Sequence, residues 1–123
     1  QIYVPDKHEV RRLALKVDIS KYEFYKGAGC DHCNGTGCQG RLGAYELLVS
    51  NDEIRTLVMS HESAANIRRA ARLRGGMSTM REDAFEKACR GITTLEEVNR
   101  KTRVDEPLEE EAPAAFPAEP AAV

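Results

Sequence analysis

Two cysteines, Cys30 and Cys33, stand in C-x-x-C spacing within the glycine-rich stretch GCDHCNGTGCQGRLGAYE, residues 29–46. Two thiolates at this spacing typically supply one side of a metal site, and a structural zinc ion is held by four ligands. The alternative is a redox pair, which usually lies where a strand enters a helix, because the helix terminus lowers a thiol pKa. Here the helix-breaking run N-G-T-G, residues 34–37, follows the cysteines, so the context favours a metal site.

The remaining histidines and cysteines do not complete such a site convincingly. Cys38 follows at C-x2-C-x4-C spacing and is either a third ligand or a small residue at the base of the turn. His32 is expected to face solvent, and so is His8, opposite the apolar stripe of its helix. Cys89 lies on an apolar helical face and is expected in the core. We therefore predict Cys30 and Cys33 as the metal ligands, with the other half of the site outside this chain.

Motifs for catalysis are missing from the sequence. There is no G-x-x-x-x-G-K-[ST] phosphate loop, since GCQGRLG lacks both the lysine and the strand-to-helix context. There is also no H-E-x-x-H, no G-x-S-x-G and no convincing pair of acids in a pocket-forming context. We expect no enzymatic activity from this chain by itself.

The elements that must position the cysteines are predicted as a small hairpin. Residues 22–27, YEFYKG, alternate aromatic and charged side chains and predict a short strand. Residues 41–48, RLGAYELL, predict a second strand antiparallel to the first, with the cysteine turn as the connecting loop. Before them, Asp6 and Glu9 have the spacing of a capping box and predict a helix over about 7–17.

Helical periodicity replaces the strand pattern from Ser50 onward. One helix follows the cap-like SND, two more are predicted over about 63–74 and 79–90, and Thr93 or Thr94 caps a fourth. The expected fold is mainly α with a small β-hairpin: a zinc-knuckle-type hairpin, a four-helix cluster and a disordered acidic tail.

Charge divides the 123 residues into a body and a tail. Residues 104–123 carry six acids, no base and four of the five prolines, a composition that predicts disorder. The body is mildly basic, which is no nucleic-acid signature by itself. We predict three parts: a partial zinc-binding subdomain over 1–49, a helical subdomain over 50–103 and the tail over 104–123.

Two further features concern partners and location. Arginines crowd the helix predicted over 63–74 without interleaved aromatic residues, so a solvated face or a contact with acidic protein surfaces is favoured over nucleic acid; these are Arg68, Arg69, Arg72 and Arg74. Neither a signal peptide nor a transmembrane span is predicted, so nothing directs the chain out of the cytosol.

Two families share the cysteine turn. CDHCNGTG fits the C-x-x-C-x-G-x-G unit of the DnaJ-type chaperone zinc domain, but that family carries the unit in several copies and it occurs once here. A longer match covers about residues 3–103, through a G-C-x-x-C-x-x-T-G turn, a G-R-x-G-x-Y-E strand, and the stretches M-x-T-x-R-E-D and G-x-T-T-x-E-E-V. This chain resembles the C-terminal part of the ATPases that drive type II secretion and type IV pilus assembly.

The resemblance implies where the missing ligands lie. In that family a first C-x-x-C lies a few residues before the position of Gln1, and both pairs hold one zinc ion. Cys30 and Cys33 would then be half of a zinc knuckle, while the residues that bind ATP and magnesium lie further upstream. Position 38 is usually aromatic in the family and is cysteine here, which leaves open whether Cys38 is a substitute ligand.

The function implied by the resemblance is that of a hexameric cytoplasmic ATPase that powers assembly of pilin-like subunits. The expected partners of this chain are the rest of the parent ATPase, neighbouring subunits of the homohexamer and inner-membrane platform proteins, but no nucleic acid. Its expected location is cytoplasmic, peripheral to the inner membrane. The alternative is a stand-alone zinc-ribbon module that binds a protein or nucleic acid through the arginine-rich helix; a second C-x-x-C and a phosphate loop upstream would exclude it.

Overall fold

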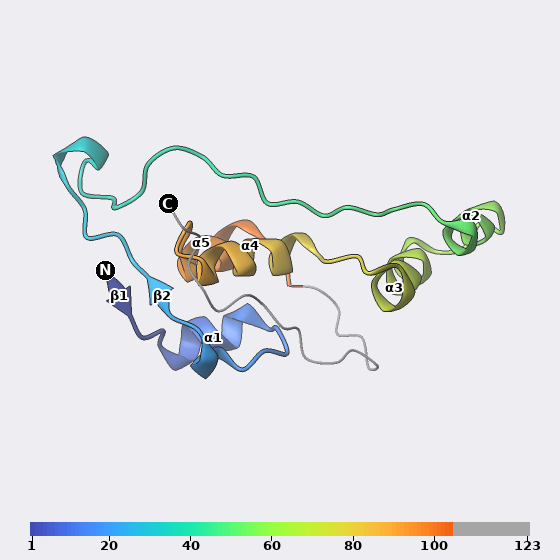
Figure 1. Cartoon of the computed structure of the whole chain (residues 1–123), viewed down its shortest axis with the longest axis horizontal. Coiled ribbons are helices and arrows are strands. Elements are labelled where there is room, and N and C mark those ends of the chain that lie inside the picture. The colour runs from blue at the N-terminus through green and yellow to red at the C-terminus, as the bar shows by residue number, and fades with distance from the viewer. Residues whose placement is uncertain (105–123) are drawn as a thin grey trace.

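A computed structural model describes residues 1–104 (Figure 1). The predicted tail, apart from its first residue, lies outside these described residues. The predicted class is confirmed, because the described chain is mainly helical with one small antiparallel sheet. In chain order the elements are β1 (Ile2–Tyr3), α1 (Lys7–Leu13), the 3-10 turn η1 (Ile19–Lys21), β2 (Phe24–Tyr25), the 3-10 turn η2 (Asp31–Cys33), α2 (Asp52–Met59), α3 (Ala64–Gly75), α4 (Met80–Cys89) and α5 (Leu95–Lys101).

Side-chain caps explain where the helices begin. The predicted capping box of α1 is present: Asp6 accepts from the backbone N–H of Glu9, whose carboxylate accepts from the N–H of Asp6. Such caps satisfy N–H groups that have no partner within the helix. The other four α-helices also follow a capping side chain, in order Asn51, Ser63, Thr79 and Thr94.

The first helix is shorter than predicted. It ends at Leu13 instead of continuing to residue 17, because Ala14 takes a left-handed backbone conformation with φ of 51°. The last carbonyl groups of the helix, those of Arg12 and Leu13, accept hydrogen bonds from the guanidinium of Arg81. A distant side chain therefore caps the end of α1, which local periodicity does not reveal.

The predicted strand pairing is wrong. β2 pairs with β1, in the register Ile2 opposite Tyr25 and Tyr3 opposite Phe24, and residues 41–48 form no strand. These residues run along α4 instead, where the N–H of Tyr45 donates to Asp83 and the carbonyl of Gly43 accepts from Lys87. Side chains of α4 thus take the place of a neighbouring strand.

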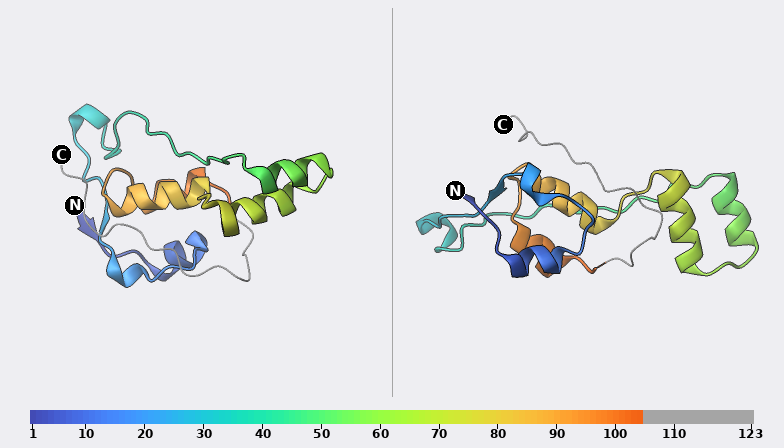
Figure 2. Two further views of the ribbon diagram at one scale, coloured as in Figure 1. Left: turned by 45° about the vertical axis from the view of Figure 1, so that its right-hand side comes forward. Right: turned by 90° about the horizontal axis from the view of Figure 1, so that it is seen from below.

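The four predicted helices are present, but they do not share one core. A larger core joins α1, β2, α4 and α5; its buried residues are Leu13, Phe24, Ala84, Phe85, Ala88, Cys89, Leu95 and Val98. A smaller core lies between α2 and α3, around Ile54, Ala70 and Ala71. Figure 2 shows α2 and α3 as a pair at one end of the molecule. The larger core draws on residues from both sides of the predicted boundary at residues 49 and 50.

Arg81 connects three helices of the larger core. Its side chain is almost fully buried, with 2% of its surface exposed. From α4 it donates to the carbonyl groups of Leu13 at the end of α1 and of Thr102 just after α5, at 2.7 and 2.9 Å. It also donates to Asn99 on α5. One guanidinium therefore satisfies the ends of two helices.

No helix of residues 1–104 combines the length and apolar character needed to cross a bilayer.

Candidate metal site

The cysteine turn lies at the end of the molecule opposite α2 and α3 (Figures 1 and 2). Two glycines close its base: a Cβ atom added to Gly27 would lie 2.1 Å from the carbonyl oxygen of Gly37. A real Cβ cannot approach a backbone atom so closely, so any larger residue at position 27 would push the two sides of the loop apart. Glycine at position 27 therefore lets the two sides of the turn meet at its base.

Within the turn the backbone curls both thiols toward one point. Cys30 precedes η2, Cys33 ends it, and Asn34 takes a left-handed conformation with φ of 51°. The Sγ atoms of Cys30 and Cys33 are 3.7 Å apart. Two sulfurs bound to one zinc at about 2.3 Å in tetrahedral geometry lie about 3.8 Å apart. The observed separation therefore fits two of the four ligand positions of a zinc ion.

The surroundings of Cys33 favour a thiolate. Its sulfur accepts from the backbone N–H groups of Cys30 and Gly37, at 3.2 and 3.1 Å. These two hydrogen bonds are the main causes that lower the pKa of Cys33 to about 6. A thiolate is the form that binds metal, so the turn prepares a ligand at neutral pH.

The other candidate ligands do not complete a metal site with Cys30 and Cys33. Among residues 1–104, no group of three histidine, cysteine or acidic side chains is placed to hold a metal ion. Cys38 is exposed, and so are His32 and His8, as predicted for the two histidines. Cys89 is buried in the larger core, which confirms its prediction, and burial raises its pKa to about 12. Within residues 1–104, the pair Cys30 and Cys33 therefore has no third such side chain placed beside it.

Arginine side chains of α3 have acidic partners within the chain that the sequence did not predict. Arg68 donates to Glu46 at 2.7 Å, Arg72 to Glu82 at 2.7 Å, and Arg74 forms an ion pair with Glu53. These pairs join α3 to the segment before α2, to α4 and to α2. The sequence signal that could have indicated these pairs is the presence of acids on the neighbouring segments: Glu46 before α2, Glu53 on α2 and Glu82 on α4.

An apolar strip lies on the segment between the turn and α2. Tyr45, Leu47 and Val49 lie at alternate positions along it and are 70%, 72% and 64% exposed. Of the residues between them, Glu46 is partly buried and Leu48 is less exposed, at 40%. Figure 1 shows this segment as a long run without helix or strand. Alternation with period two is the pattern of a strand with one face to bury. We call residues 45, 47 and 49 the apolar strip.

Comparison with known proteins places these features in a family. Residues 6–100 match the family model described as type II/IV secretion system protein. The chain is 50% identical over 99 residues to the type IV pilus assembly ATPase PilB of Thermus thermophilus, covering 80% of this chain and 11% of that protein. It is 44% identical over 94 residues to the type II secretion system protein HxcR of Pseudomonas aeruginosa, covering 76% and 20%. The type II secretion system protein E of Dickeya dadantii is 36% identical over 104 residues, covering 84% and 20%. The chain thus spans between about a tenth and a fifth of the length of these relatives.

Proposed function

The chain belongs to the family of type II/IV secretion system proteins, and from this premise we propose that it is the C-terminal part of a secretion or pilus-assembly ATPase. The observation that carries the proposal is its likeness to relatives named as a type IV pilus assembly ATPase and as type II secretion system proteins. The parent couples ATP hydrolysis to assembly of pilin-like subunits at the inner membrane. Membership in this family weighs against the stand-alone zinc-ribbon module.

Within the parent, the cysteine turn contributes half of a structural zinc site. Cys30 and Cys33 hold two positions of the zinc, and a second C-x-x-C in the parent supplies the others. The sulfur separation and the low pKa of Cys33 support this assignment. Zinc bound by four protein ligands adds stability to a small fold and leaves no open position for catalysis. The role of the turn is therefore structural.

The rest of the chain contributes packing instead of chemistry. ATP and magnesium bind to other residues of the parent, and no turnover is expected from this chain, in which no phosphate loop occurs. The parent acts as a homohexamer in the cytoplasm, attached to the inner membrane through platform proteins. The apolar strip supports such packing, because contiguous exposed apolar residues commonly mark a surface that another part of a protein covers.

Bound zinc tests the proposal directly. Zinc is measured after gel filtration for this chain and for a longer form of the parent that includes an upstream C-x-x-C. We expect about one zinc per longer chain and little in this one, because half a site forfeits most of a binding energy on the order of 10 kcal/mol.

Matched cysteine variants separate the ligands. Cys30→Ser should remove zinc from the longer form, whereas Cys89→Ser, in the core and away from the turn, serves as the control. Unchanged zinc content in the Cys30→Ser form would refute the metal assignment. If this chain retained one zinc and Cys38→Ser removed it, Cys38 would be a ligand. ATP hydrolysis by this chain, with contaminants excluded, would refute the proposed division of labour.

A further inference from the structure

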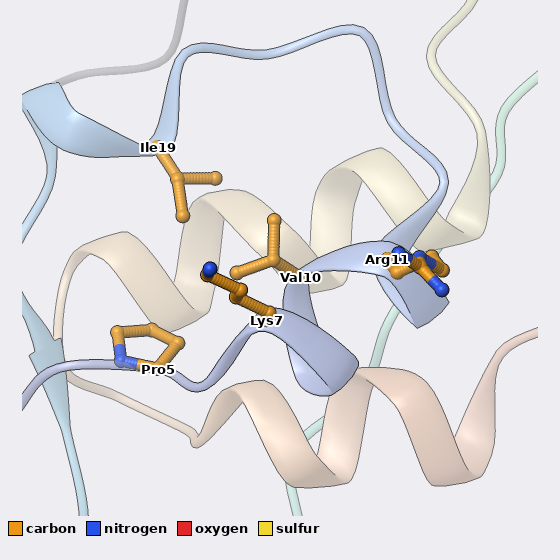
Figure 3. Close-up of a pocket in the computed structure, with 5 residues that line it drawn as sticks. All are labelled: Pro5, Lys7, Val10, Arg11 and Ile19. Carbon is orange, nitrogen blue, oxygen red and sulfur yellow. The ribbon is translucent and has the colours of Figure 1, made fainter.

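A groove beside α1 combines an apolar floor with basic edges. It is lined by Pro5, Val10 and Ile19 together with Lys7 and Arg11, and its volume is about 420 Å³ (Figure 3). Pro5 precedes α1 and Ile19 begins η1, so the groove lies between the helix and the segment that follows it. In the close-up, the apolar side chains border one shared space and Arg11 lies at its far end. A groove of this composition suits a short segment that carries both an apolar and an acidic side chain.

The described chain ends beside the C-terminal end of α1, the helix that lines the groove. The guanidinium of Arg81 binds the carbonyl groups of both Arg12 and Thr102, so the end of α5 lies beside the end of α1. Val104 follows two residues later. An extended chain spans about 3.3 Å per residue, so the four residues from Val104 to Leu108 reach up to about 13 Å. That length matches the distance along about two turns of a helix, roughly 11 Å.

The sequence beyond this point is complementary to the groove in charge. Residues 105–111, DEPLEEE, carry five acids around one leucine and contain no base. On the other side, Lys7, Arg11 and Arg12 of α1 are exposed. The two acids of this helix region, Asp6 and Glu9, are engaged with each other in the capping box. The acids of residues 105–111 and the basic side chains of α1 attract each other, although solvent and salt weaken the attraction.

We propose that residues 105–111 of this same chain bind along α1, with Leu108 over the apolar floor of the groove and the neighbouring carboxylates beside Lys7 and Arg11. The tether makes the contact intramolecular, which raises the effective concentration of the segment to the millimolar range. At this effective concentration the segment occupies the groove even if its intrinsic affinity for the groove is weak. The bound segment also covers α1, so any other acidic peptide must displace it.

Nuclear magnetic resonance on the whole chain tests this contact. The amide signals of Val10, Arg11 and Ile19 are compared between the wild type and two tail variants, Leu108→Ser and the triple change Glu109→Lys, Glu110→Lys and Glu111→Lys. We expect all three signals to shift in both variants. The shift should shrink at high salt, because the Debye length falls from about 30 Å at 0.01 M to about 3 Å at 1 M.

A charge exchange distinguishes the contact from a general effect of charge. Arg11→Glu alone should release the segment, and its combination with the triple lysine change should restore the bound signals. Arg69→Glu on α3 combined with the same triple change is the matched control and should restore nothing. Because Arg11 is exposed, these variants should fold, which the dispersion of the core amide signals checks.

Two results would overturn the proposal. The first is that the three signals are the same in the wild type and both tail variants. The second is that they respond to an added DEPLEEE peptide in the triple variant but not to changes in the tail, since the groove would then take an acidic peptide from a partner. The outcome is independent of zinc content and of ATP turnover.

Discussion

Replacing Arg81 with methionine should destabilise the chain more than any exposed substitution. Methionine keeps much of the length and apolar stem of arginine but donates no hydrogen bond. Five acceptors would lose a charged donor: the carbonyl groups of Arg12, Leu13 and Thr102, and the side-chain oxygens of Asn99 and Thr102. The Thr102 hydroxyl still donates to the carbonyl of Val98, so four acceptors are left without a partner of this kind. A buried acceptor left unsatisfied costs about 1–3 kcal/mol. At the lower end, the four together cost about 4 kcal/mol.

Urea unfolding measures this loss. Far-ultraviolet circular dichroism is the suitable probe, because the chain is helical and contains no tryptophan. With a slope of about 2 kcal/mol per molar urea, a loss of about 4 kcal/mol lowers the midpoint by about 2 M. Since small domains are stable by about 5–15 kcal/mol, the variant could also be unfolded without urea, which the same spectrum would show.

Two variants with smaller expected losses of stability test the role of the Arg81 hydrogen bonds even if Arg81→Met does not fold. Asn99→Ala removes one acceptor of Arg81 and also the donor that Asn99 offers to the carbonyl of Glu9, so we expect a loss of about 1–2 kcal/mol. Arg69→Met on the exposed side of α3 is the matched control and should change stability by less than about 0.5 kcal/mol. If Arg81→Met unfolded at the same urea concentration as this control, the guanidinium would not hold the three helices together.

Three further outcomes are expected. Gly27→Ala should weaken zinc binding by the longer form of the parent, because its Cβ would meet the carbonyl of Gly37; unchanged zinc affinity would contradict the role of the close approach. In the metal-free chain, the alkylation rate of Cys33 should have its midpoint near pH 6, because a lowered pKa keeps the thiolate present until the pH falls to about that value. Peptide mapping after alkylation measures it, and a midpoint near 8.5, the value of an ordinary thiol, would refute the effect of the two N–H donors. Leu47→Lys should leave the stability of this chain within about 0.5 kcal/mol, since the side chain is exposed, but should lower the yield of folded parent; equal yields would argue against a covered apolar strip.

The sequence by itself determined the features that depend on a few neighbouring residues. The capping box at Asp6 and the helix over about 63–74 were predicted, and the latter is observed as Ala64–Gly75 before the left-handed Gly76. Caps and left-handed glycine ends are decided within about four residues. The C-x-x-C turn was recognised for the same reason, and its two sulfurs indeed lie close together. The core position of Cys89 followed from helical periodicity.

Tertiary structure decided what depends on distant partners. β2 could pair with any nearby strand-like segment, and the apolar alternation of residues 41–48 did not reveal that α4 would hold that segment by side chains. The partners of Arg68, Arg72 and Arg74 are likewise acids on other elements. In each case the free energy comes from a contact between residues far apart in the chain, and the type and spacing of neighbouring residues carry no information about which of several possible partners lies close.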